Sequence, residues 1–174
     1  MPQLVWDSLH HPLPGPGLAS PRRPASVERV KIVTIEEAEK LVEAGAAFVD
    51  VRTPEEFADG HVPGAINVPV SLAAGTGMAP NAEFVSLMAA LFEKNAPLVV
   101  SCKAGGRSAR AAALLGQAGF QHVSDMSVGF EGNRDPFGRA QPGWRQEGRD
   151  IETDATDEQT YAGVRRRAAT KAQR

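Results

Sequence analysis

Short apolar runs alternate with segments of helical periodicity from residue 31 onward, and this alternation limits the possible folds more than any other feature of the chain. The apolar runs have strand length and cover residues 47–51, 65–68, 97–101 and 122–126. Between them, apolar residues recur at helical spacing, for example over residues 84–92. The pattern predicts the α/β class, with a parallel sheet covered by helices on both faces. In such sheets, ligands bind where the carboxyl ends of the strands meet.

Capping residues predict where three of the helices begin. Thr34 and Glu37 have the spacing of a capping box, in which each side chain accepts a hydrogen bond from the other residue's backbone N–H. Thr53 and Glu56 repeat this spacing, and the proline between them suits the first position of a helix. Asn81 is expected to cap a third helix, because asparagine is a favoured N-cap residue.

The single cysteine of the chain, Cys102, stands where an apolar strand ends and an alanine-rich helix begins. It opens the run Cys102-Lys103-Ala104-Gly105-Gly106-Arg107-Ser108. The first turn of a helix has N–H groups without intrahelical acceptors, and its positive dipole end favours an anion such as a thiolate. The glycines let N–H groups turn toward the sulfur, while Lys103 and Arg107 add positive charge. The run predicts an activated nucleophile beside an anion pocket, whereas a lone cysteine elsewhere is commonly a small buried hydrophobe.

Three segments together resemble a known family. They are Val49-Asp50-Val51-Arg52-Thr53-Pro54-Glu55-Glu56-Phe57, then Gly60-His61-Val62-Pro63-Gly64-Ala65-Ile66-Asn67, then the cysteine loop itself. In this order and spacing the chain resembles the rhodanese-like sulfurtransferases over roughly residues 33–153. The resemblance implies a single-domain, rhodanese-like α/β fold with a roughly five-stranded parallel sheet and helices on both faces. It also implies the activity of a thiosulfate sulfurtransferase.

The chemistry that the resemblance implies is covalent and centres on Cys102. Its thiolate would take a sulfane sulfur from a small anionic donor such as thiosulfate, hold it as a persulfide, and pass it to cyanide, a thiol or a protein acceptor. The residues expected to bind the donor are Lys103, Ala104, Gly105, Gly106, Arg107 and Ser108. No cofactor is expected. No metal site is expected either, because the histidines show no ligand spacing and the chain has one thiol.

Three further residues are expected to support this site. Asp50 follows an apolar run and needs a partner when buried, so we interpret it as a carboxylate that orients the cysteine loop. Arg52 either shares that role or forms a local salt bridge or helix cap. His61 lies in a Gly-His-x-Pro-Gly segment. We interpret it as a residue that fixes this turn by hydrogen bonding, not as a catalytic group.

Two alternative functions stay open. Related phosphatases and arsenate reductases place a histidine before the cysteine and one residue more between cysteine and arginine, whereas here Ser101 precedes Cys102 and Arg107 follows after four residues. The shorter loop suits a single sulfur atom better than a tetrahedral phosphate, and it contains no general acid. The second alternative is a persulfide carrier or a regulatory binding module with a protein partner, although such modules commonly lack the cysteine.

Composition divides the chain into three parts. Residues 1–30 form an irregular leader rich in proline and glycine, residues 31–153 form the rhodanese-like domain, and residues 154–174 form a charged tail. In the tail, acidic residues precede basic ones, which is typical of a solvated helix or a disordered end.

Three shorter segments inside the domain carry their own expectations. Residues 73–80 are expected to form a loose loop. The resemblance implies a closing helix over residues 143–148, around Trp144, and an insertion near the site over residues 133–142.

The overall charge and composition disfavour several classes of partner. The 19 Lys and Arg residues and 21 Asp and Glu residues give a net charge of −2, which does not favour nucleic-acid binding by the whole domain. No apolar stretch has the ~20 residues needed to span a bilayer, and the N-terminus lacks the pattern of a signal peptide. One cysteine forms no internal disulfide and fits a reducing compartment. We therefore expect a cytoplasmic protein without nucleic-acid or membrane partners.

Overall fold

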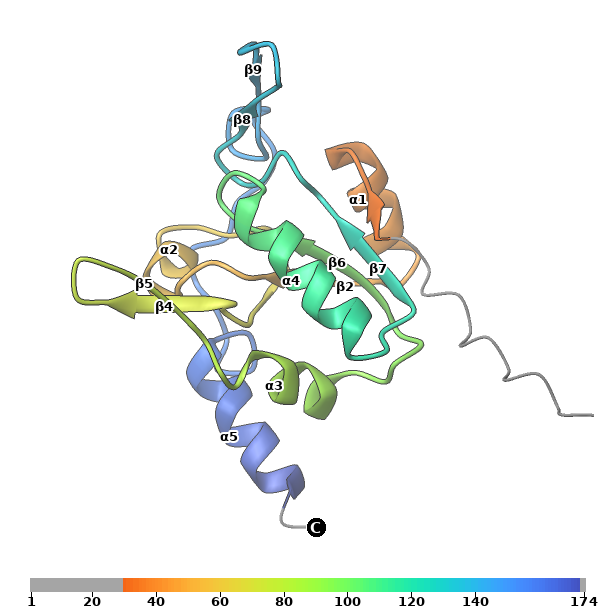
Figure 1. The fold of residues 1–174 in the computed structure, drawn as a ribbon, viewed down its shortest axis with the longest axis vertical. Helices are drawn as coiled ribbons and strands as arrows, with labels where there is room; N and C mark the ends of the chain where they lie inside the picture. The colour runs from red at the N-terminus through yellow and green to blue at the C-terminus, as the bar shows by residue number, and fades with distance from the viewer. Residues whose placement is uncertain (1–29, 173–174) are drawn as a thin grey trace, which may run out of the picture.

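A five-stranded parallel sheet forms the centre of the computed structural model, which describes residues 30–172 (Figure 1). The strand order is β1-β7-β6-β2-β3. These strands are β1 (Lys31–Ile32), β2 (Ala47–Asp50), β3 (Ile66–Asn67), β6 (Pro97–Ser101) and β7 (His122–Asp125). The predicted α/β class and parallel sheet are confirmed. Apart from Val30, the predicted leader lies outside the described residues.

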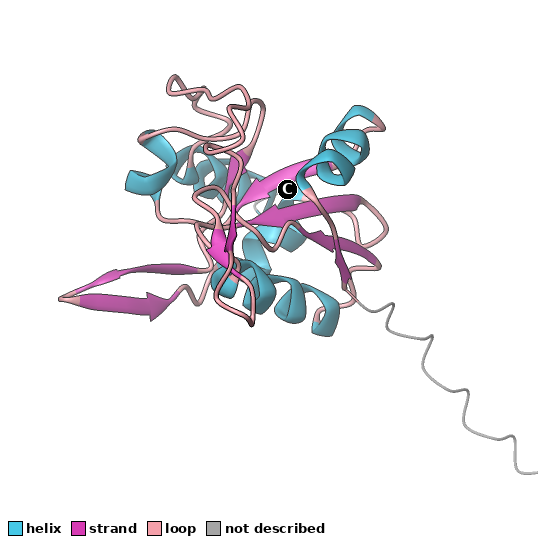
Figure 2. Ribbon diagram, turned by 90° about the horizontal axis from the view of Figure 1, so that it is seen from above, coloured by secondary structure: helices cyan, strands magenta, loops and turns pink. Residues whose placement is uncertain are grey.

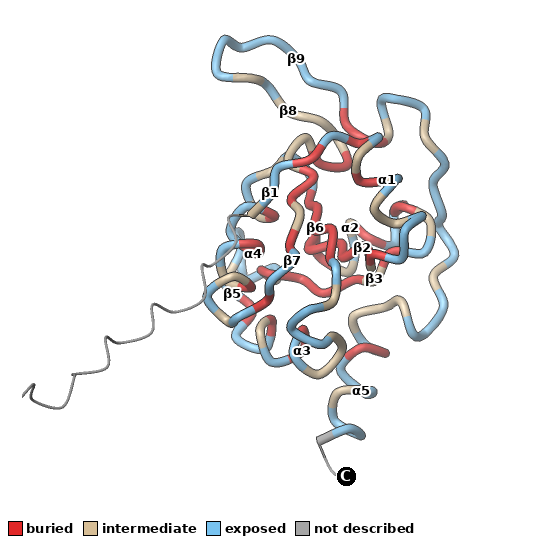
Figure 3. Tube along the Cα trace, turned by 90° about the vertical axis from the view of Figure 1, so that its right-hand side faces the viewer, coloured by how far each residue is buried: buried red, intermediate tan, exposed pale blue. Residues whose placement is uncertain are grey.

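Helices cover both faces of this sheet (Figures 1 and 2). They are α1 (Ile35–Glu43) and α2 (Pro54–Ala58), which pack with one apolar cluster, and α3 (Phe84–Leu91), α4 (Gly106–Gln117) and α5 (Tyr161–Ala172), which pack with the other. Along β6, Leu98 and Val100 join the cluster of α3 and α4, while Val99 joins the cluster of α1. Because both faces are covered, the central strands read as continuous apolar runs, and they form the buried centre in Figure 3.

The predicted capping boxes at the first two helices are present. The Thr34 and Thr53 side chains each accept from the backbone N–H of the glutamate three residues on, and both glutamates accept from the N-cap N–H in return. The prediction for Asn81 was wrong by two residues, because α3 begins after Glu83. Asn81 instead stabilises the preceding turn: its Oδ1 accepts from Glu83 N at 3.0 Å, and its Nδ2 donates to Pro69 O at 2.8 Å.

Two segments expected to lack strands form β-hairpins. Residues 73–80 are not a loose loop, since β4 (Ser71–Ala74) and β5 (Gly77–Pro80) pair antiparallel and project from the sheet as an arm (Figure 2). The insertion at 133–142 contains β8 (Asn133–Arg134) and β9 (Ala140–Gln141), which stand beyond the N-terminal end of α4 (Figure 1). Hydrophobic periodicity does not reveal such short strands, because each strand offers too few residues to show alternation.

The expected closing helix around Trp144 is a turn over residues 144–148, not a helix. The segment is bounded by Gly143 and by Gly148, which has φ of +71° and so ends any helical path. Trp144 is nevertheless buried: its indole N–H donates to Asp150 O at 2.8 Å, and its ring meets Phe48 edge-on at 6.1 Å between centroids. The tryptophan therefore closes the core without a helix.

The charged tail packs onto the domain through α5. Val164 is fully buried in the same cluster as α3 and α4. The basic side chains of this helix find partners within the chain: Arg165 pairs with Glu83 at 2.8 Å, and Arg166 pairs with Asp157. These ion pairs neutralise part of the positive charge that the sequence concentrates at this end. Within residues 30–172, no helix has the length and apolar character needed to cross a membrane.

Candidate functional site

Three neighbouring strands bring their carboxyl ends to one edge of the sheet. In the parallel register, Asp50 at the end of β2 pairs with Ser101 at the end of β6, and Asp125 at the end of β7 pairs with Val100. Cys102 follows β6 directly, so its thiol stands between two strands that each end in an aspartate. This is the edge at which open α/β sheets bind ligands.

The loop after β6 curls so that a backbone N–H points at the sulfur. Gly105 N donates to Cys102 Sγ at 3.1 Å, and Cys102 Sγ lies 3.6 Å from Ser108 Oγ. Cys102 is 2% exposed, whereas Lys103 and Ala104 are exposed at the loop surface. A buried sulfur is thus held in contact with polar hydrogens from its own loop.

Helix α4 starts immediately beyond this contact and presents its N-terminus to the loop. Its first internal backbone bond runs from Ala109 N to Gly105 O at 3.0 Å. The N–H groups of residues 106–108 therefore have no acceptor within the helix. Together with the dipole of a 12-residue helix, they create a positive field in which an anionic sulfur is stabilised.

A second segment, residues 126–131, braces the loop from the side. Phe130 N donates to Cys102 O, and Glu131 N donates to Lys103 O, both at 2.8 Å. Gly129, with φ of +75°, lets this segment pass so close that a Cβ there would lie 2.5 Å from Lys103 O. The loop conformation is therefore fixed by bonds to its own carbonyl groups.

Replacing Gly105 by alanine is expected to disrupt this arrangement. Gly105 has φ of +94°, and a Cβ there would lie 2.2 Å from Ser127 O, so either the loop or its brace must move. We expect the free energy of unfolding to fall by about 1–3 kcal/mol, as for other strained backbone positions. Urea denaturation measures this change. The matched control is Gly106→Ala, because a Cβ at that position meets nothing within 4 Å; equal losses in the two variants would contradict the role of Gly105.

Arg107 is paired with a residue that the sequence analysis assigned only to helix capping. Its Nη1 and Nη2 donate to the two carboxylate oxygens of Glu56 at 2.6 and 2.8 Å. Burial alone would raise the pKa of Glu56, but hydrogen bonds from Arg107 and from Thr53 N outweigh it and lower the pKa to about 2. The Glu56 bonds raise the pKa of Arg107 in turn. The pair ties the cysteine loop to α2.

A Glu56→Gln variant tests whether the Arg107–Glu56 ion pair stabilises the fold, through the pH dependence of its free energy of unfolding. Because the pKa of Glu56 is lowered from 4.5 to about 2 in the folded protein, the pair stabilises above pH 4.5 and its contribution disappears as the pH falls toward 2. At neutral pH we expect the variant to lose about 1–3 kcal/mol of stability, since a hydrogen-bonded charge pair is broken. The deficit should shrink between pH 4.5 and 2.

The control for that experiment is Glu55→Gln in the same helix, whose side chain is exposed. Chemical denaturation of the two variants and the unaltered protein across this pH range gives the comparison. A deficit for Glu56→Gln that did not change with pH would contradict an ionised pair.

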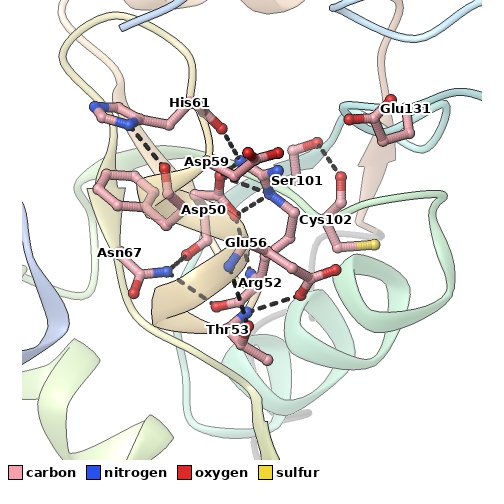
Figure 4. A network of polar contacts seen from close by, with 12 residues as sticks. Asp50, Arg52, Thr53, Glu56, Asp59, His61, Asn67, Ser101, Cys102 and Glu131 are labelled. Carbon is pink, nitrogen blue, oxygen red and sulfur yellow. Dashed lines mark hydrogen bonds and ion pairs between the residues drawn. The ribbon is translucent and has the colours of Figure 1, made fainter. Parts of the chain in front are cut away.

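Asp50 and Arg52 form a buried ion pair behind the loop (Figure 4). Arg52 Nη2 donates to Asp50 Oδ2 at 2.6 Å, and Arg52 Nε lies 3.0 Å from both carboxylate oxygens. The guanidinium also donates to Gly60 O at 2.8 Å and stacks over the Phe130 ring at 4.1 Å. The local salt bridge considered for Arg52 is therefore present. No direct hydrogen bond from Asp50 to the cysteine loop is described, because the side-chain bonds of this carboxylate all go to Arg52.

His61 lies away from the thiol. In Figure 4, His61 and Asn67 lie on one side of the Asp50–Arg52 pair, and the Cys102 sulfur lies on the other. The fully buried imidazole stacks on Phe57 at 3.8 Å, and its Nδ1 lies 3.0 Å from Phe57 O. These contacts hold the turn after α2. The structure does not bring His61 to the sulfur.

The loop residues from Lys103 to Ser108 surround the cysteine as the sequence placed them, but several partners were missed. Glu56 binds Arg107 although 51 positions of the chain separate them. The sequence carried no signal for this contact, because helix capping already accounted for a glutamate at position 56. Asp125 ends β7 beside the loop, and an acidic residue after an apolar run was the available signal. The backbone N–H groups of Phe130 and Glu131 brace the loop. Backbone contacts of this kind leave no pattern of side chains in the sequence from which they could be predicted.

Metal ligation finds no support in the part of the chain that the structure describes. No three or more His, Cys, Asp or Glu side chains there gather closely enough to hold an ion. Two of the acidic groups near the site are paired with arginines: Asp50 with Arg52, and Glu56 with Arg107. The loop presents a single thiol beside backbone hydrogen-bond donors.

Comparison with protein families gives a match to the model described as "Rhodanese-like domain" over residues 34–134. The matched segment contains β2, α2, β6, the cysteine loop and α4, and it ends with β8. The turn around Trp144 and helix α5 lie beyond it.

Two plant proteins and a bacterial one illustrate the similar sequences. "Protein HIGH ARSENIC CONTENT 1, mitochondrial" from Arabidopsis thaliana is 38% identical over 62% of this chain and 64% of its own length. "Thiosulfate sulfurtransferase 16, chloroplastic" from the same plant is 41% identical over 56% of this chain and 82% of its own. "Thiosulfate sulfurtransferase GlpE" from Pseudomonas aeruginosa is 38% identical over 55% and 76%. Because two of these names carry organellar locations, the cytoplasmic location stays a prediction.

Solved structures agree with the fold. The crystal structure of Rv0390 from M. tuberculosis superposes with a TM-score of 0.59, covering 72% of this chain and 98% of that one at 24% identity. The Alr3790 protein from Anabaena sp. gives a TM-score of 0.52 over 80% of this chain and 91% of its own, at 22% identity. At these identities the likeness concerns the arrangement of strands and helices alone.

Proposed function

The chain belongs to the family of rhodanese-like domains, and on that premise we propose that it transfers a sulfane sulfur through a persulfide on Cys102. The donor is thiosulfate or a similar small anion, and the acceptor is cyanide, a thiol or a protein thiol. One observation carries the proposal: Gly105 N donates to Cys102 Sγ at 3.1 Å in front of α4. The sulfur of a transferase must be anionic before and after each transfer, and this contact favours that charge. Relatives named thiosulfate sulfurtransferase support the assignment.

The first half-reaction loads the cysteine. The Cys102 thiolate attacks the outer sulfur of thiosulfate, a new S–S bond forms, and sulfite leaves with the electron pair of the broken S–S bond. The persulfide keeps one negative charge on its outer sulfur. The N–H groups of residues 106–108, which have no acceptor in α4, are the donors that stabilise this charge. The exposed ammonium of Lys103 attracts the anionic donor to the loop.

The second half-reaction releases the sulfur. A nucleophilic acceptor attacks the outer sulfur, and Cys102 leaves as the thiolate with which the cycle began. Because the chain has no second cysteine, the persulfide is not resolved by an internal disulfide. The cycle is therefore of the ping-pong type, with donor and acceptor using the same site in turn.

Arg107 has a different part in this proposal from the donor binding that its position suggested. Both of its terminal nitrogens bind Glu56, so its charge is already paired. We assign it to holding the shape of the loop. The same pairing disfavours phosphatase or arsenate reductase activity, in which an arginine binds the equatorial oxygens of a tetrahedral oxyanion in bidentate fashion.

The proposal is tested by thiosulfate:cyanide sulfurtransferase activity, together with intact mass after treatment with thiosulfate. Turnover and a mass gain of one sulfur atom are expected. A mass gain without turnover would favour the alternative of a persulfide carrier that delivers sulfur to a protein partner. A folded protein showing neither signal would contradict thiosulfate as donor, and turnover of arsenate in a parallel assay would favour the reductase alternative.

A further inference from the structure

Asp125 is a buried carboxyl group at the site that the proposed reaction does not use. It is 2% exposed, and it pairs with Val100, so its side chain lies on the face of the sheet that Val100 and Cys102 share. Among the described residues, Asp125 Oδ1 has no hydrogen-bond partner. The hydroxyl of Ser108 lies close enough to this carboxyl group to lower its pKa by hydrogen bonding.

Ser108 links this carboxyl group to the reactive sulfur. The serine is fully buried in the first turn of α4, and its Oγ lies 3.6 Å from Cys102 Sγ and 3.0 Å from Gly105 O. A serine hydroxyl has one proton to donate and two lone pairs that accept. Three groups around Ser108 can therefore accept its single proton: the Gly105 carbonyl, the Asp125 carboxyl and the sulfur.

The protonation state of Asp125 determines whether both the carboxyl group and the Cys102 sulfur can form a hydrogen bond with Ser108. If Asp125 were a carboxylate while Cys102 is a thiolate, two anions would compete for one hydroxyl proton in a buried space. If the carboxylate took that proton, the sulfur would keep Gly105 N as a donor but lose the serine hydroxyl. If Asp125 is a neutral acid, its own proton is donated to Ser108 Oγ. The serine proton is then free to turn toward the sulfur. Only the second arrangement satisfies the thiolate and the carboxyl group together.

We propose that Asp125, as a neutral carboxylic acid, is a positioning residue that donates to Ser108 and so directs the serine hydroxyl at the anionic sulfur of Cys102. This deepens the proposed sulfur transfer, and its catalytic consequence rests on that function. The hydroxyl would serve the Cys102 thiolate before loading and again when the acceptor has taken the outer sulfur and the thiolate is regenerated. No bond is made or broken by Asp125, whose proton stays within its hydrogen bond to Ser108.

The surroundings of Asp125 favour its neutral form. Burial raises its pKa, and the hydrogen bond from Ser108 lowers it by less. Cys102 follows β6 on the same face of the sheet as Asp125, and a thiolate nearby would disfavour a second negative charge. On the other side, β1 places Ile32 opposite Asp125, and the neighbouring Lys31 is exposed and pairs with Glu37 at 3.6 Å.

The test follows the pH at which iodoacetamide alkylation of Cys102 reaches half its maximal rate, measured by intact mass in three variants. Asp125→Leu removes the donor, so the midpoint is expected to rise by about one pH unit, the usual size of a lost hydrogen bond to a charged group. Ser108→Ala should give a similar rise. Asp125→Asn keeps an N–H donor for Ser108 and carries no charge, so it should restore the midpoint of the unaltered protein.

A double variant separates positioning from a general structural effect. If Asp125 acts through Ser108, then Ser108→Ala combined with Asp125→Leu should shift the midpoint no further than Ser108→Ala alone. Additive shifts, or an unchanged midpoint in Asp125→Leu, would overturn the proposal. A fall of the midpoint in Asp125→Asn would also overturn it, because it would show that the aspartate is ionised beside the thiol. That variant decides the charge state even if the leucine variant does not fold.

These measurements report on the thiol and need no sulfur donor. Failure of the alkylation pattern would therefore refute the role of Asp125 while leaving the sulfurtransferase proposal intact. Conversely, the expected pattern without any thiosulfate turnover would support the positioning of Ser108 and refute only the proposed reaction. Thermal unfolding of each variant confirms that the compared proteins are folded.

Discussion

A Cys102→Ser variant is expected to lose sulfur transfer completely and to gain no mass on treatment with thiosulfate. The serine hydroxyl is not ionised at neutral pH and is a poor nucleophile toward sulfur, so neither the attack on thiosulfate nor the persulfide is available. The substitution is nearly isosteric, and Cys102 is 2% exposed in a well-packed loop, so the fold should be retained. Steady-state turnover and intact mass, with circular dichroism for the fold, measure the effect.

The matched control is Ser101→Ala, one position earlier. Ser101 is equally buried, but its hydroxyl makes only long contacts, at 3.5 Å to Cys102 O and 3.4 Å to Met126 O. That variant keeps the thiol and should keep the gain of one sulfur atom. Residual turnover in folded Cys102→Ser protein would contradict a persulfide mechanism and would direct attention to non-covalent transfer or to a contaminating activity.

Replacing Arg52 by leucine is expected to lower the free energy of unfolding by about 3–5 kcal/mol, the usual cost of leaving one member of a buried ion pair without its partner. Arg52 and Asp50 are each about 3% exposed in their side chains and lie 2.6 Å apart. The variant leaves the Asp50 carboxylate without its guanidinium and also removes the hydrogen bond to Gly60 O and the stacking on Phe130. Urea denaturation at neutral pH gives the measurement.

The chain offers a control pair with the same separation but a different environment. Arg139 and Asp135 also lie 2.6 Å apart, yet the arginine side chain is 75% exposed. Arg139→Leu should therefore cost under about 1 kcal/mol. Comparable losses in the two variants would contradict burial as the cause. In the double variant Asp50→Leu with Arg52→Leu, the uncompensated charge is absent, so part of the lost stability should return.

Two of the helix starts and four strands of the central sheet followed from the sequence, because their signals lie within a few residues. Thr34 and Glu37, and likewise Thr53 and Glu56, form their capping boxes through neighbouring backbone groups. The apolar run before Cys102 is covered on both faces, as its unbroken hydrophobicity indicates. Local prediction failed where the structure depends on a turn between short strands, as in the hairpin of β4 and β5. The closing helix that the resemblance implied around Trp144 is absent, because glycines bound that segment.

What the sequence determined by itself is a thiol at the junction of a buried strand and a glycine-started helix, since that junction is a local property of residues 97–108. What only the tertiary structure decided is which distant groups complete the site. The strand order brings Asp125 to Ser108, and the packing of α2 brings Glu56 to Arg107. Hydrogen bonds between segments that are far apart in the chain depend on how the sheet is ordered and covered, and spacing along the sequence does not encode that order.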